Sequence, residues 1–495
     1  VHIMGIEADS KIEEEVLTPR QWLEDRRKIG MSQGLEVTYA MLTRLGMPQM
    51  AFPCVHVAGT NGKGTTCVYL ANTLSLSGKK TGLFTSPHLC RVEERIRIDG
   101  RPINSEQLDK AIHAIRVMSL QEPVLHPTYF ETLFLAAMIC FKAANVQRAV
   151  IETGLGGRLD ATRCCYADFT VLTEISLEHS DILGDTIGEI AKEKAAIARP
   201  GATMLARWPY DSSAMIAIEE ATTKGCGFWW RGDRLALLSF ENANEPFREI
   251  GSGLGKDGDI IPYGLFDGFM TMQMDNAILG HASAWFLLPH HPGVPPLHDV
   301  MERTHWPGRM QQITGPKDVE LLLDCAHNPS GIEKMVNELI LRKQREEDAG
   351  RSFSPSAILV GTTKQEDLSI FVHPIVELLT EMNNPMIVVT EPSDGRLPAV
   401  ASDDLATEIR LQFPDARIQV RPNLHVALTT AVEEAVESSS HSIFDGVTGS
   451  VWCFGSIHLI GGLLTILGED SDDALTTMRW KDDDIIGDRD IPMNP

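Results

Sequence analysis

The sequence feature that most constrains this chain is a glycine-rich loop at residues 59–65, Gly-Thr-Asn-Gly-Lys-Gly-Thr. The apolar run Ala51–Ala58 before the loop predicts a buried strand, and the stretch Thr65–Ser77 after it predicts a helix. A loop in this context presents consecutive backbone N–H groups and a helix N-terminus, which together can hold a triphosphate. Lys63 can reach the β- and γ-phosphates, and Thr65 can bind Mg²⁺. The loop therefore predicts a nucleotide-binding α/β domain.

Short apolar runs that alternate with helical stretches extend this prediction to the whole chain. In the first part, strands are expected at Lys80–Thr85, Ala149–Thr153 and Phe169–Ile175. In the second part, they are expected at Val319–Leu323, Ile358–Val360, Met386–Val389 and Val451–Phe454. The fold class is therefore predicted to be α/β with mostly parallel sheets.

The turn-forming residues Trp306–Arg309 separate these two series and predict a domain boundary. We predict an N-terminal P-loop ATPase-like domain at residues 1–308 and a smaller Rossmann-like α/β domain at 309–468. Residues 469–495 are rich in Asp and Glu, and this composition predicts a solvated or disordered tail. Residues 241–263 are rich in turn-forming types and predict a surface excursion that is not part of the core.

Composition excludes several classes of protein. The formal charge of -24 argues against a nucleic-acid partner, because no basic tract interrupts the acidity. The longest apolar stretch, Leu133–Phe141, is too short to span a membrane. The nine cysteines lack metal-ligand spacing and predict reduced thiols. We expect a cytoplasmic monomer that binds neither nucleic acid nor membranes.

The phosphate loop is a variant in which Gly64 stands between Lys63 and Thr65. Several further segments of the chain match motifs that occur together with this variant. In chain order they are residues 84–89 (FTSPHL), 94–98 (ERIRI), 152–162 (ETGLGGRLDAT), 193–197 (EKAAI), 307–309 (PGR) and 324–329 (DCAHNP). Together they resemble the folylpolyglutamate synthase and dihydrofolate synthase family of the Mur ligase superfamily. The resemblance runs from about Gly34 to Gly462 and implies an ATP-dependent ligase with a Mur ligase-like ATP-binding domain and a glutamate-ligase domain.

The resemblance assigns most of the nucleotide contacts. It implies that ATP is bound by two groups of residues: the loop residues Gly59, Thr60, Asn61, Gly62, Lys63, Gly64 and Thr65, and the more distant Asn276, Arg309 and Asp324. A chance glycine-rich turn and a strand-end capping role for Asp324 are the alternatives. Because these residues lie on both sides of the predicted boundary, we expect a cleft that closes by hinge motion near Gly308.

The resemblance also implies two Mg²⁺ sites, held by Thr65, Ser86, Glu152, His179 and Lys194. Lys194 matches a lysine that relatives carry as a carbamate, which would convert a cation into an anionic oxygen ligand. Its alternative is a surface lysine paired with Glu189. For His179 the alternative is an ordinary core or surface histidine. A monovalent cation such as K⁺ is a further candidate cofactor.

The remaining candidates concern the substrates. The resemblance places His327, Ser456 and His458 near the amino acid, and Arg158 and Asp160 near the acceptor, while a turn histidine is the alternative for His327. Lys63, Lys194, His179 and His327 form the expected catalytic set. Arg163 and Glu178 depart from the family pattern of Asn and Asp, which leaves the acceptor pocket open to change.

The predicted reaction joins L-glutamate to a folate-type carboxylate through an acyl phosphate, with release of ADP and phosphate. The acceptor is dihydropteroate, tetrahydrofolate with its glutamate tail, or both, and we expect both. Two alternatives have different chemistry: another Mur-type amino-acid ligase, and a P-loop nucleotide-binding protein that does not ligate.

Overall fold

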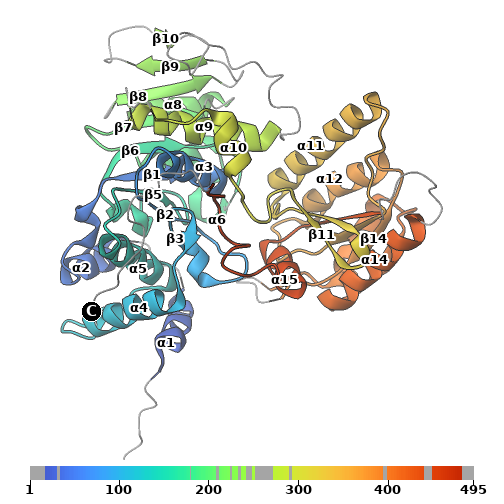
Figure 1. Cartoon of the computed structure of the whole chain (residues 1–495), viewed down its shortest axis with the longest axis horizontal. Coiled ribbons are helices and arrows are strands. Elements are labelled where there is room, and N and C mark those ends of the chain that lie inside the picture. The colour runs from blue at the N-terminus through green and yellow to red at the C-terminus, as the bar shows by residue number, and fades with distance from the viewer. Residues whose placement is uncertain are drawn as a thin grey trace, which may run out of the picture.

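The computed structural model of this chain contains two β-sheets, each covered by helices (Figure 1). It describes residues 17–30, 34–178, 180–207, 211–222, 226–231, 236–240, 248–250, 271–288, 293–393, 398–439 and 449–481. All strands of the first sheet precede residue 251, and all strands of the second sheet follow residue 310. We refer to the two sheets with their helices as the first and second units. The division at residues 308 and 309 into separate domains stays our proposal.

The first sheet has ten strands in the order β10-β9-β8-β7-β6-β1-β5-β2-β3-β4. The six strands from β8 to β2 in that order are parallel, and antiparallel strands extend the sheet at both ends. The strands are β1 (Cys54–Ala58), β2 (Thr81–Phe84), β3 (Ile96–Ile98), β4 (Arg101–Pro102), β5 (Arg148–Glu152), β6 (Ala167–Leu172), β7 (Thr203–Arg207), β8 (Cys226–Arg231), β9 (Ala236–Phe240) and β10 (Arg248–Ile250).

Helices cover both faces of the first sheet. Their bounds are α1 (Pro19–Asp25), α2 (Glu36–Arg44), α3 (Lys63–Leu76), α4 (Ser105–Ser119), α5 (Tyr129–Ala143), α6 (Ser180–Leu183), α7 (Ile187–Ala195), α8 (Ser212–Thr222), α9 (Thr271–Leu287) and α10 (Leu297–Arg303). Helices α3 and α9 bury apolar side chains against one face, and α1, α2, α4 and α5 pack against the other. Capping boxes begin α4 at Asn104 and α5 at Thr128, where Glu131 accepts from the Thr128 N–H at 2.8 Å.

The second sheet has six strands in the order β11-β12-β16-β13-β14-β15. Only β11, at one edge, is antiparallel to its neighbour. The elements are β11 (Gln311–Thr314), β12 (Glu320–Leu323), α11 (Pro329–Asp348), β13 (Ala357–Val360), α12 (Leu368–Glu381), β14 (Met386–Val389), α13 (Ser402–Gln412), β15 (Ile418–Val420), α14 (Leu424–Ser439), β16 (Ser450–Phe454) and α15 (Ile457–Leu467). Helices α11 to α13 cover one face, and α14 and α15 the other.

The predicted fold class is confirmed: both units are α/β with mostly parallel sheets. One detail differs from the sequence predictions for this part of the chain. The excursion predicted at 241–263 includes an edge strand at Arg248–Ile250, and its other residues lie outside the described ones. In the described part of the chain, no helix is both long and apolar enough to cross a membrane.

The prediction of a disordered tail is wrong for residues 471–480. This stretch, drawn in dark red in Figure 1, runs from the end of α15 back to the first unit. Leu475, Thr477 and Met478 are buried there, and the backbone of Thr477 bonds to Gly100 and His305. The few apolar side chains of this stretch pack against the first unit. Because they do not recur with a regular spacing, hydrophobic periodicity within the stretch does not reveal this contact. Residues 482–495 lie outside the described residues.

Candidate functional site

The predicted site residues gather where the carboxyl ends of the two parallel sheets meet. The phosphate loop follows β1, Ser86 follows β2, and Glu152 ends β5. In the second unit, Asp324 follows β12 and Ser456 follows β16. Open α/β sheets bind ligands at this end of their strands, since loops and helix N-termini converge there. The two edges touch directly: Asn61 donates to the Ser330 hydroxyl at 3.3 Å.

The phosphate loop adopts a backbone shape that only glycine favours at its turn. Gly62 has a φ of 81°, and a Cβ there would lie 2.2 Å from Asn276 Oδ1. Asn276, predicted to contact the nucleotide, is buried directly against this turn. Lys63 Nζ donates to the Thr60 carbonyl at 2.8 Å, so its ammonium lies over the loop it is expected to serve.

Glu152 has the properties of a cation ligand. Its side chain is 3% exposed, and burial raises the pKa of its carboxyl to about 7 against the opposing charge of Lys63. Among the described residues no lysine or arginine nitrogen lies within 4.0 Å of it, and the Ser86 N–H donates to it at 2.9 Å. A Cβ on Gly64 would lie 3.6 Å from Glu152 Oε2, so the loop backbone passes close to the carboxylate. Ser86 is joined to Glu152 by this hydrogen bond and Thr65 follows Gly64, so the two hydroxyls and the carboxylate form a donor set that fits Mg²⁺.

Lys194 is a buried lysine that reaches the phosphate loop. It is 2% exposed, and its Nζ donates to the Gly59 carbonyl at 2.8 Å. Burial, with Lys63 nearby, lowers the pKa of its ammonium to about 7. The alternative of a surface lysine paired with Glu189 is wrong, because Glu189 instead accepts from Asp185 and Thr186 at the start of α7.

His179 lies outside the described residues, so its predicted metal-binding role stays a prediction. Its neighbour Glu178 accepts a hydrogen bond from Asn328 Nδ2 of the second unit at 2.9 Å. The glutamate found in place of the family's aspartate therefore reaches across to the opposite unit.

Asp324 and Arg309 are the ATP contacts that the sequence predicts on the side of the second unit. Asp324 is 4% exposed and accepts from the backbone N–H groups of Met310 and Ala326, at 2.9 and 2.8 Å. Burial raises the pKa of its carboxyl, and the nearby Arg309 opposes this shift. Asp324 thus ties the segment that carries Arg309 to the end of β12.

His327 is held in one orientation. Its Nδ1 donates to the Cys325 carbonyl at 2.9 Å, which leaves Nε2 as the hydrogen-bond acceptor of the neutral ring. Burial lowers the pKa of the imidazole and favours this neutral form. Ser456 caps α15 by accepting from the His458 N–H at 3.2 Å, so the structure gives Ser456 a local role beside the predicted one.

Asp160 and Arg158, the two residues predicted near the acceptor, differ in their contacts and exposure. Asp160 uses both oxygens to accept from the backbone of Gly154, Leu155 and Thr162, which orders the loop 154–162. These contacts favour a positioning role for Asp160. Arg158 is 56% exposed at its side chain and pairs with Glu193 at 2.9 Å. Its predicted contact with the acceptor stays a prediction.

Comparison with known proteins places this arrangement in a family. No protein-family model matches the chain. The dihydrofolate synthase/folylpolyglutamate synthase of Bacillus subtilis is 30% identical over 344 residues, covering 66% of this chain and 76% of that protein. The chain belongs to the dihydrofolate synthase/folylpolyglutamate synthase family. The sequence prediction of the family and of an ATP-dependent ligase is confirmed.

Other members of the family match along nearly the whole chain. The dihydrofolate synthetase of Saccharomyces cerevisiae is 27% identical and covers 88% of this chain and 97% of its own length. A Mycobacterium tuberculosis folylpolyglutamate synthase complexed with ADP and AMPPCP superposes with a TM-score of 0.73 at 24% identity, covering 90% of this chain and 98% of that one. At this identity, the structural likeness shows that the fold is shared.

Sequence reasoning about the family missed a cationic cluster beside the metal-ligand candidates. Arg95 donates to His88 Nδ1 at 2.9 Å and lies over the Tyr129 ring, with 5.6 Å from its guanidinium carbon to the ring centroid. Arg27 lies over the same ring at 4.1 Å. Among the described residues no carboxylate lies within 4.0 Å of Arg95. Burial lowers the pKa of His88 to about 3, and Arg27 pairs with Glu24. In a chain of charge -24, Arg95 therefore supplies the positive charge of this cluster where anionic substrates are expected.

A second missed feature joins the two units. Lys334 of α11 forms an ion pair with Glu174, which follows β6. The two residues are far apart in sequence, and no motif quoted for the family includes either of them. Only the three-dimensional arrangement brings them together.

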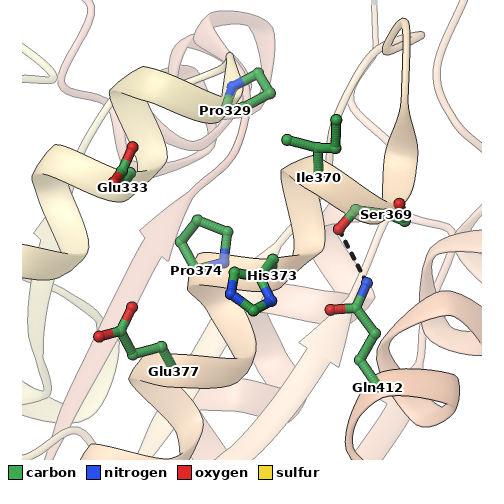
Figure 2. A pocket seen from close by; sticks show the side chains of 8 residues that line it. All are labelled: Pro329, Glu333, Ser369, Ile370, His373, Pro374, Glu377 and Gln412. Atoms are coloured by element: carbon green, nitrogen blue, oxygen red, sulfur yellow. Dashed lines mark hydrogen bonds between the residues drawn. The ribbon is translucent and has the colours of Figure 1, made fainter.

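A groove of about 580 Å³ on the second unit does not belong to this site. It lies over α11, α12 and α13, and Figure 2 shows Glu333, His373 and Glu377 among its lining side chains. Its two carboxylates disfavour ATP, glutamate and folate, which are all anions. The groove is therefore not a candidate substrate site.

Proposed function

We propose that this chain uses ATP to join L-glutamate to the carboxylate of a folate-type acceptor. The observation that carries the proposal is the meeting of two sheet edges. The phosphate loop, Lys63 and Glu152 come from one edge, and Asp324 and His327 come from the other. Direct hydrogen bonds between Asn61 and Ser330 and between Glu178 and Asn328 hold the edges together.

A carboxylate is a poor electrophile for an amine at neutral pH, so ATP must first activate it. The nucleotide site on one edge and the amino-acid site on the other must therefore lie close together. The acceptor carboxylate attacks the γ-phosphate of ATP to give an acyl phosphate and ADP. Lys63 and the N–H groups of the phosphate loop stabilise the charge that develops on the transferred phosphoryl group. Bound Mg²⁺, held by Thr65, Ser86 and Glu152, would neutralise part of the phosphate charge.

The second half of the reaction takes place at the edge of the second unit. The glutamate amine attacks the acyl carbon, and phosphate leaves as the amide forms. His327, fixed by the Cys325 carbonyl, orients the amino acid with help from Ser456 and His458. Contact between the units excludes water from the acyl phosphate, which would otherwise hydrolyse.

We infer that the acceptor is both dihydropteroate and tetrahydrofolate with its glutamate tail. Arg95, which has no carboxylate within 4.0 Å among the described residues, supports an acceptor that carries extra carboxylates. The Arg163 substitution does not argue for a changed acceptor pocket, because its guanidinium donates to the backbone carbonyls of Ile197 and Ala198, at 3.4 and 3.2 Å.

We also propose that Lys194 carries a carbamate that binds a second Mg²⁺, with K⁺ as a further candidate cation. Burial beside the Gly59 carbonyl supports this proposal: among the described residues no carboxylate lies within 4.0 Å of Lys194, and a buried lysine without such a partner is unusual. A cytoplasmic monomer remains our inference, in line with the eight free cysteines among the described residues.

The carbamate on Lys194 can be tested with carbon-13-labelled bicarbonate. The wild-type protein should give a carbamate NMR signal that Lys194→Ala lacks.

The decisive experiment supplies purified protein with ATP, Mg²⁺, glutamate and either dihydropteroate or tetrahydrofolate, and identifies the products by mass. We expect a gain of one glutamyl unit on each acceptor, with ADP release that requires both the acceptor and glutamate. Equal ATP hydrolysis without either substrate would reject the ligase and favour a nucleotide-binding protein that does not ligate. Lys63→Ala should abolish turnover with both acceptors.

A further inference from the structure

The ion pair between Lys334 and Glu174 lies at the contact between the two units. Lys334 Nζ bonds to Glu174 Oε1, and the two side chains are 28% and 26% exposed. Lys334 is in the second turn of α11, the helix that begins directly after the Asp324–Asn328 segment. The partners thus connect the amino-acid side of the site to the nucleotide side.

Glu174 forms one wall of the phosphate loop through its backbone. Its carbonyl accepts from the Thr60 N–H at 2.7 Å, and it forms an isolated β-bridge with Asn61. The preceding residue, Thr173, donates its hydroxyl to the Asn61 carbonyl at 2.8 Å. A displacement of Glu174 therefore moves the backbone that holds Thr60 and Asn61.

Glu174 also belongs to a chain of charges that reaches the other side of the loop. Arg207 lies 3.8 Å from its carboxylate and pairs with Asp275 at 2.7 Å. Asp275 precedes Asn276, which packs against the turn at Gly62. Lys334 is the member of this chain that comes from the second unit.

We propose that Lys334 is a positioning residue for phosphoryl transfer. Its pair with Glu174 stabilises the shape of the phosphate loop only when α11, and with it His327, is in place. An ion pair between two separately folded units forms in the closed arrangement and is lost when they separate, so it contributes to closure. This inference rests on the proposed ligase function and adds a residue that links the two half-reactions.

The test compares Lys334→Met, Lys334→Arg, Glu174→Gln and the double variant of Lys334→Met with Glu174→Gln. Lys110→Met is the matched control, since it removes a lysine from an exposed pair with Glu106 within one helix of the first unit. For each protein, we would measure glutamate-dependent kcat, the KM for glutamate, the Kd of Mg-ADP and the melting temperature.

We expect Lys334→Met to lower glutamate-dependent kcat by about five- to tenfold, while the Kd of Mg-ADP changes by less than about twofold. Lys334→Arg should retain most of the activity, because it keeps the charge. The double variant should be no slower than the slower of the two single variants, since Lys334→Met and Glu174→Gln both remove the same ion pair. A structural role alone would instead lower the melting temperature of Lys334→Met and Glu174→Gln and leave the glutamate-dependent kcat of the folded protein unchanged.

Full activity of Lys334→Met, or additive losses in the double variant, would overturn the proposal. A second measurement separates it from the proposed function. If the wild-type protein does not ligate, small-angle scattering with Mg-ADP still tests the ion pair: Lys334→Met should enlarge the radius of gyration relative to wild type and Lys110→Met. An unchanged radius would then reject the role of Lys334 by itself.

Discussion

At the phosphate loop, single residues set the shape of the backbone that is expected to hold ATP. Gly62 combines a left-handed φ with close packing against Asn276, so a side chain there meets two separate obstacles. An L-residue in this backbone region costs roughly 1–2 kcal/mol, before any clash. One methyl group added at Gly62 is therefore expected to disturb the backbone of the loop.

Gly62→Ala should weaken Mg-ATP binding by about tenfold or more, because a Cβ would displace Asn276 or the loop itself. Gly78→Ala is the matched control: Gly78 has a similar φ of 82°, and nothing lies within 4 Å of a Cβ there. Isothermal titration of both variants with Mg-AMPPCP checks the effect. Equal affinities for the two variants would contradict the role given to Gly62.

The buried, neutral His56 is expected to make the free energy of unfolding fall at acidic pH. It is fully buried on β1 and contacts Thr162 at 2.8 Å; burial, with Arg199 and Arg163, holds the pKa of its imidazole well below 6.5. The unfolded chain takes up a proton below about pH 6.5, while the folded protein does not. The stability contributed by neutral His56 is thus complete above that pH and is lost as the pH falls.

His56→Gln should therefore lose less stability than wild type between pH 8 and pH 5.5, with a difference of at most about 1.4 kcal/mol per pH unit. Urea unfolding at the two pH values measures this difference, and each protein at pH 8 serves as its own reference. An equal loss in both proteins would show that other groups cause the acid sensitivity.

At the scale of elements, the stretch 471–480 acts as a strap between the units. It bonds to Gly100, Asn72 and Arg97 of the first unit, and Thr304 pairs with Met478 beside the linker between the units. The chain therefore crosses between the units twice, once before β11 and once after α15. Both crossings lie next to each other, which restricts the directions in which the units can move.

Leu475→Ala should destabilise the protein by about 2–4 kcal/mol, because Leu475 is fully buried under this strap. Asp473→Ala, at an exposed position of the same stretch, should have little effect. Thermal and urea unfolding measure both changes. A neutral Leu475→Ala variant would mean that the strap adds no stability.

At the scale of the whole molecule, an acidic surface surrounds a site built for anions. The charge of -24 opposes capture of ATP, glutamate and folate, while Lys63, Arg95 and helix N-termini concentrate positive charge at the meeting edges. Binding at that junction stabilises the folded form, since unfolded chain does not bind nucleotide.

Mg-AMPPCP at one hundred times its Kd should stabilise the folded protein by about 2.7 kcal/mol and raise its melting temperature. Lys63→Ala should show little of this rise, since its ammonium is expected to bind the phosphates. Differential scanning fluorimetry with and without Mg²⁺ measures both. The same rise in Lys63→Ala would contradict the assignment of the loop.

The features of this protein that depend on neighbouring residues could be predicted from its sequence. The strand, the phosphate loop and the helix are contiguous, so apolar periodicity and glycine positions suffice to predict β1, the loop and α3. The same holds for the strands β5, β12 and β16 that carry or precede Glu152, Asp324 and Ser456. Motifs in chain order also identified the family.

Contacts between distant groups could not be predicted from the sequence and were found in the three-dimensional structure. Lys334 and Glu174, Asn328 and Glu178, and the docking of Leu475 each join segments that are far apart along the chain. The structure also replaced the surface pairing considered for Lys194 by burial against the phosphate loop. Such contacts depend on how two separately folded units pack, and no local pattern of residues encodes that packing.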